Sequence, residues 1–110
     1  MMVNGDLEVV CKKDFDSIEV SVVLSKYPRG IYRVEVIDYD KYFIRGVFVL
    51  DEKVARLIYD MIVSLLAVAD KTFQEAEGLD TEEDEKRFVE KFSKIGQMLK
   101  KILDAKSPVQ

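Results

Sequence analysis

The chain has 110 residues, of which 48% are hydrophobic and 35% are charged, with a formal net charge of −4. This length and apolar content suit one small domain with a real core and exclude a disordered chain. No apolar run approaches the roughly 18 residues of a membrane span, and the N-terminus lacks the pattern of a signal peptide, so we expect a cytoplasmic protein.

The side chains that most enzymes need are scarce in this sequence. Histidine is absent and Cys11 is the single cysteine, which excludes Ser-His and Cys-His nucleophiles, zinc sites of the usual kind and an internal disulfide. Asp38 and Asp40 are the one suggestive pair of carboxylates for a hydrolase, but an exposed turn explains them better. We therefore predict no enzyme, no cofactor and no metal site.

Charge is unevenly distributed along the chain. Seven acids and no base lie between Glu75 and Glu85, and the rest of the chain has 14 acids against 17 bases. A basic patch can therefore exist on an acidic protein, because salt confines the field of each patch to roughly 10 Å. The single Asn and three Gln beside 38 charged residues are typical of hyperthermophile proteins.

Residues 7–50 predict a β half. Residues 7–12 and 17–25 form two strands, and the second alternates apolar with polar side chains. A turn at residues 13–16 would join them, and Tyr27-Pro28-Arg29-Gly30 would form the next turn. Strands at 31–37 and 42–50 follow, and the short connections favour an antiparallel meander of four strands.

The register of the last two strands decides which side chains share a face. We expect Arg33, Glu35, Phe43 and Arg45 to point outward together, with Glu35 paired to Arg45 across the strands. A slip of one residue would invert this arrangement.

Residues 51–104 predict a helical half with helices at 51–77 and 82–104. Asp51 is placed to cap the first helix, a glycine stop at 77–79 would end it, and Thr81 would open the second. A seam in the second helix has coiled-coil spacing: Phe88, Phe92, Ile95, Leu99 and Ile102. The apolar surface of both helices exceeds what one sheet face needs, so we expect a homo-oligomer, a dimer or a tetramer, assembled through them. Residues 1–104 thus form one α+β domain, and residues 105–110 a frayed tail.

Four of the five tyrosines fall between residues 27 and 42, interleaved with basic side chains. Aromatic rings offer stacking surfaces to bases, and Lys and Arg neutralise phosphates, so this mixture predicts a sheet that binds single strands. The candidate contacts are Lys12, Lys13, Lys26, Tyr27, Arg29, Tyr32, Arg33, Lys41, Tyr42, Phe43 and Arg45. The bland alternative is that the aromatic residues are strand formers with their rings in the core.

The order of strands and helices, with Tyr and Arg concentrated on the third and fourth strands, resembles the archaeal ThermoDBP-related proteins. The stretch from Gly30 to Met61 also resembles the Whirly-like coactivator fold, in which a curved meander leads directly into a helix. The resemblance implies sequence-tolerant binding of single-stranded DNA, with RNA a second option, by an oligomer. It assigns no individual residues.

A second function class remains open. The broad apolar surface of the helices could dock a partner, in which case the chain is a protein-interaction or assembly module and the Tyr/Arg region is structural. Substituting Arg33 and Arg45 by Glu would then leave function intact, whereas a charge at Leu66 or Phe92 would abolish it.

Overall fold

The chain folds as four strands followed by two helices, and the structure, a computed structural model, describes residues 7–40, 43–76 and 81–105. The strands are β1 (Glu8–Phe15), β2 (Val20–Lys26), β3 (Tyr32–Asp38) and β4 (Phe43–Val49), and the helices are α1 (Glu52–Glu75) and α2 (Glu82–Ala105). Neighbouring strands are antiparallel, in the order β1-β2-β3-β4. The predicted α+β class and the four-stranded meander are therefore confirmed.

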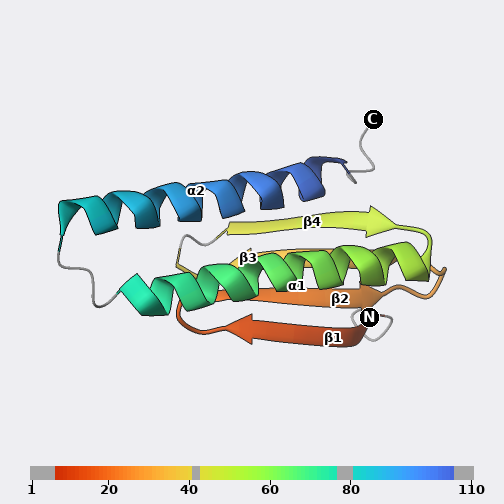
Figure 1. Cartoon of the computed structure of the whole chain (residues 1–110). Coiled ribbons are helices and arrows are strands. Elements are labelled where there is room, and N and C mark those ends of the chain that lie inside the picture. The colour runs from red at the N-terminus through yellow and green to blue at the C-terminus, as the bar shows by residue number, and fades with distance from the viewer. Residues whose placement is uncertain (1–6, 41–42, 77–80, 106–110) are drawn as a thin grey trace.

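The two helices form one layer on one side of the sheet. α1 runs along the strands in front of β2 and β3, and α2 runs antiparallel to α1 on the side of β4 (Figure 1). Of the four strands, α2 contacts chiefly β4. No helix of the described chain lies over the opposite face. Within residues 7–40, 43–76 and 81–105, neither helix is long and apolar enough to cross a membrane.

The core lies between the sheet and α1. On the face that α1 covers, β2, β3 and β4 each carry fully buried residues: Val22 and Leu24, Val34, and Val47. They pack against buried positions on one side of α1, including Ala55, Ile58, Ile62 and Leu66. Burial of each large aliphatic side chain stabilises the fold by about 1.5–3 kcal/mol, so this layer holds the helix to the sheet.

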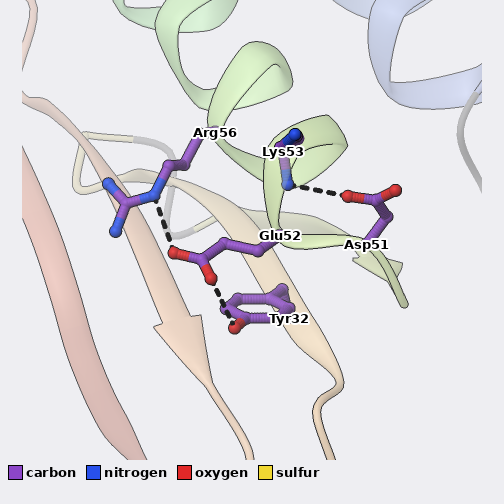
Figure 2. Close-up of polar contacts among 5 residues, drawn as sticks. All are labelled: Tyr32, Asp51, Glu52, Lys53 and Arg56. Atoms are coloured by element: carbon purple, nitrogen blue, oxygen red, sulfur yellow. Dashed lines mark hydrogen bonds and ion pairs between the residues drawn. The ribbon is translucent and has the colours of Figure 1, made fainter.

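The first turn of α1 is tied to β3 by side-chain contacts (Figure 2). The Asp51 carboxylate accepts a hydrogen bond from the backbone N–H of Lys53 at 2.8 Å, which confirms the predicted cap. Glu52 accepts from the Tyr32 hydroxyl at 3.2 Å and from Arg56 Nε at 3.0 Å. The hydrogen bond from Arg56, followed by that from Tyr32, lowers the pKa of Glu52.

The second helix begins as predicted, since the Thr81 hydroxyl accepts from the backbone N–H of Asp84 at 3.0 Å. Near its start, the rings of Phe88 and Phe92 pack edge-on against Phe73 of α1, with centroids 6.3 and 6.2 Å away. The seam predicted for this helix is buried or half-buried along its length. The glycine stop predicted for α1 and the tail at 106–110 lie outside the described residues.

The predicted register of β3 against β4 is wrong. Arg45 pairs with Val36, and Glu35 pairs with Gly46, so Arg45 lies on the side of the helices and Glu35 on the other side. Arg45 forms an ion pair with Asp104 of α2, and Glu35 pairs with Arg33 of its own strand. The reason is packing: Val47 is needed in the core, and the period of two carries Arg45 to the same face.

The first hairpin turn also differs from the prediction. β1 continues to Phe15, and the turn comprises Asp16 to Glu19, so Ile18 lies in the turn and not in a strand. Glu19 adopts a left-handed conformation with φ of 54°, as the last residue of a longer hairpin loop often does. The turn predicted at residues 27–30 is confirmed, and Gly30 has the positive φ of 79° that it requires.

Candidate nucleic-acid interface

The sheet has one face that the helices leave uncovered, here called the open face. Strand register places its side chains in three rows across the sheet. The rows are Val9, Ser25, Arg33 and Phe48, then Lys12, Val23, Glu35 and Gly46, then Asp14, Ser21, Ile37 and Ile44. Ile44 is 60% exposed and Phe48 46% exposed. These are the two large apolar side chains of β4 that the described chain leaves exposed on this face.

One end of the open face holds an aromatic cluster, here called the Phe48 cluster: Phe48, Tyr27 and Arg33. The rings of Phe48 and Tyr27 are 6.1 Å apart between centroids, at an interplanar angle of 52°. The Arg33 guanidinium carbon lies 5.9 Å from the Phe48 ring centroid, and Arg33 Nη1 donates to the Tyr27 hydroxyl at 3.2 Å. These contacts hold a flat cation against an exposed ring.

A glycine makes room for this arrangement. A Cβ placed on Gly46 would lie 3.2 Å from the backbone oxygen of Val34 and 3.6 Å from Nε of Arg33. Because Gly46 has no side chain, the stem of Arg33 can lie beside β4 and reach Phe48. A larger residue at this position would push against the backbone of β3.

A second exposed ring lies near the other end of the open face. Tyr39 is 49% exposed, and it lines a hollow of about 440 Å³ together with Lys12, Asp14 and Ser21. The Ser21 hydroxyl donates to the Asp14 carboxylate in this hollow. The open face therefore has an accessible aromatic ring towards each end.

The electrostatics of the open face are nearly balanced. Lys12 Nζ lies 3.8 Å from Asp14 Oδ1, and Arg33 is ion-paired with Glu35. One further cation, Arg29, is exposed in the turn after Tyr27. Any ligand of this face would thus be held more by its flat or apolar parts than by phosphate neutralisation.

The structure separates the predicted site residues into two groups. Lys12 and Arg33 lie on the open face, with Tyr27 half-buried and Arg29 exposed in the turn beside it. The register places four others on the side of the helices: Lys13, Lys26, Tyr32 and Arg45. Lys41 and Tyr42 lie outside the described residues, and of Phe43 only the backbone, paired with Asp38, is described.

All four are engaged in contacts on the covered side, and the Lys13 ammonium lies 6.0 Å from the ring centroid of Phe15. Tyr32 is buried and bonded to Glu52, so it offers no ring face to a base. Lys26 lies 6.0 Å above the Tyr32 ring, and Arg45 is paired with Asp104. A surface that joins all the predicted residues does not exist on this sheet.

The sequence reasoning missed Phe48, Ile44, Val9 and Tyr39 as site residues. Phe48 and Ile44 point to the same face of β4, and the wrong register assigned that face to the core. Val47 and Val49 point to the other face of β4, just before the first helix. These two β-branched residues could have indicated that this face belongs to the core.

No metal-ligating cluster is formed by the described residues. Among them, no group of three or more Cys, Asp or Glu side chains could hold a metal ion. Asp40 is exposed, and its backbone N–H donates to Asp38 Oδ1 at 3.1 Å. This is the pattern of a turn, and the two carboxylates are not buried together.

Compared with models of protein families, with curated proteins and with solved structures, the chain gives no match. The resemblance to the ThermoDBP-related and Whirly-like proteins thus stays a prediction.

Proposed function

We propose that the open face binds single-stranded nucleic acid without strong sequence preference. The observation that carries this proposal is the Phe48 cluster: an exposed aromatic ring on an uncovered sheet face, with an arginine and a second ring in contact with it. Stacking on such a ring contributes about 1–3 kcal/mol per base and accepts any base.

Two exposed rings define a path for the strand. One base would stack on Phe48 and another on Tyr39, with Ile44 and Ile37 providing apolar contact between them. Arg29 and Lys12 would contact phosphates. Duplex DNA would bind poorly, because its bases are already stacked and cannot reach the rings.

The charge balance of the open face predicts that binding affinity depends only weakly on salt concentration. Lys12 and Arg33 each have a carboxylate partner, so few phosphates would be neutralised. For one or two phosphates, the slope of log affinity against log salt is about −0.7 to −1.4 for a single strand. Binding by a broad basic surface would give a much steeper slope.

Fluorescence anisotropy with labelled single-stranded and double-stranded oligonucleotides tests this proposal. Phe48→Ala and Tyr39→Ala should each weaken single-strand binding by about 1–3 kcal/mol, and Arg29→Ala should flatten the salt slope. Val89→Ala, at an exposed apolar residue of α2, is the matched control and should bind like the native chain. Equal loss in all variants, or no binding at low salt, would refute the proposal.

A second candidate function is self-assembly through the outer side of α1. Leu57, Met61 and Val68 are exposed there, and their spacing of four and seven residues puts them on one side of the helix. A second copy of the chain is the partner we propose for this stripe. Native mass by light scattering should exceed that of one chain, and Met61→Glu should return it to one chain. A monomer at high concentration would refute this assembly.

A further inference from the structure

A cavity lies between the helices and one end of the sheet, on the side opposite the open face. Its volume is about 530 Å³, within the range of small-molecule sites. Leu66 and Phe73 of α1, Phe92 and Leu99 of α2, and Val20 and Val36 of the sheet are among the side chains that line it. Most of its wall is therefore apolar.

The placing of α2 explains why this cavity exists. Near its start, α2 is held to α1 by the rings of Phe73, Phe88 and Phe92. Near its end, Asp104 is held to β4 by Arg45. Between these two contacts the cavity wall includes Gly96, which brings no side chain to fill the space.

Packing within the chain does not require this glycine. A Cβ placed on Gly96 would meet no atom within 4 Å, and glycine in the middle of a helix is destabilising relative to alanine. Gly96 is itself exposed, so the space beside it opens to solvent, and no described side chain fills it. This space can admit an occupant from outside the chain.

The polar part of the cavity carries negative charge. Glu19, Asp38 and Asp40 line it at the end formed by the two hairpin turns, and no described lining residue is basic. The backbone of Glu19 is fixed there, since its carbonyl accepts from the Tyr39 N–H at 2.9 Å and its own N–H donates to the Asp16 carbonyl at 3.3 Å. Such a site disfavours fatty acids and phosphates and favours a cation.

We propose that this cavity binds a small amphipathic amine. The apolar part lies among the side chains of Leu66, Phe92 and Leu99, and the protonated amino group lies beside the carboxylates of Glu19 and Asp40. This site is on the other side of the sheet from the Phe48 cluster, so it is independent of nucleic-acid binding and each can fail without the other.

Three probes of the same chain length and different charge test the proposal: octylamine, octanol and octanoate. Octylamine is protonated at neutral pH, as lysine is. Titration calorimetry should give octylamine the tightest binding, about tenfold tighter than octanoate, with octanol between them. Amide chemical shifts around Gly96 and Ala69 should move on binding. If no probe binds, or if octanoate binds as tightly as octylamine, the proposal is wrong.

Filling the cavity provides the second test. Gly96→Leu should reduce octylamine binding at least about tenfold while the helix content is unchanged. Gln97→Leu adds the same side chain at the next, exposed position, which does not line the cavity, and it should bind like the native chain. If Gly96→Leu instead reduces the mass of an oligomer and the native chain binds no probe, a second copy occupies the cavity and the proposal is overturned.

Neutralising the carboxylates of Glu19 and Asp40 tests amine recognition without changing the packing of the cavity. In the double variant Glu19→Gln with Asp40→Asn, octylamine affinity should fall to that of octanol, and octanol affinity should stay the same. Both positions are exposed, so the fold should be retained even if Gly96→Leu fails to fold. Unchanged octylamine affinity in the double variant would refute recognition by these carboxylates.

Discussion

The two faces of this sheet are built from the same four strands, yet their side chains differ. The covered face is aliphatic, and Val22, Leu24, Val34 and Val47 on it are fully buried. The open face mixes exposed apolar residues such as Ile44 and Phe48 with charged pairs. A face that only needed to meet water would carry few large apolar side chains. This difference is the observation on which the proposed binding surface depends.

The sharpest test of this comparison is stability. Leu24→Ala on the covered face should lower the free energy of unfolding by about 2–5 kcal/mol, because it leaves a cavity in the core. Ile44→Ala on the open face should change it by only about 0.5 kcal/mol. Urea denaturation of the two variants measures both values. Equal losses would show that something covers the open face in solution, which would contradict its role as a free binding surface.

The fold was predictable from the sequence because each of its elements has a local signal. Alternation marked β2, a Pro-Gly turn marked the hairpin that follows, and Asp51 marked the start of α1. These signals depend on neighbouring residues, and they do not depend on how distant strands align. The order of the elements and their type followed from them.

The candidate site was less predictable because it depends on register. Both faces of β4 carry apolar side chains, so hydrophobicity alone could not decide between Phe48 and Val47 as the core residue. The error moved Arg45 to the wrong face and hid Phe48. Tyr39 was missed for another reason: it lies in a turn, and only the folded chain shows that it borders the same hollow as Lys12.

Gly46 offers a way to disturb the open face without touching the core. Gly46→Ala should lower the free energy of unfolding by about 1 kcal/mol, because the new methyl group meets a backbone oxygen of β3. It should also displace Arg33 from Phe48 and weaken single-strand binding. Denaturation and anisotropy on the same preparation measure the two effects. An increase in stability with unchanged binding would show that Gly46 has no part in positioning Arg33.

Replacing Gly96, on the covered side, should change the stability in the opposite direction from replacing Gly46. Gly96→Ala should raise the free energy of unfolding by about 0.5–1 kcal/mol, because alanine favours the helix and its methyl group meets nothing. Thermal denaturation followed by circular dichroism measures the change. A loss of stability would mean that the helices approach each other in solution more closely than the structure indicates, with a smaller cavity between them.

The smallest expected effect concerns the link between the covered face and α1. Hydrogen bonds from Arg56 and Tyr32 lower the pKa of Glu52 in the folded chain, so the ionised form favours folding. The contribution is fully present above the ordinary glutamate pKa of about 4.3, and it is lost as the pH falls through the lowered folded value. Glu52→Gln should therefore be less stable than the native chain near neutral pH, and the difference should shrink in acid.

Urea midpoints at neutral pH and at about pH 3 measure this change. Glu90→Gln, on the exposed side of α2, is the control and should give the same difference from the native chain at both pH values. The effect should be small, because Glu52 is exposed and water screens its partners. If the difference between Glu52→Gln and the native chain grew in acid, the sign of the linkage would be reversed. The contact between Tyr32 and Glu52 would then not favour the ionised carboxylate, and the start of α1 would depend on the Asp51 cap and the core beneath it.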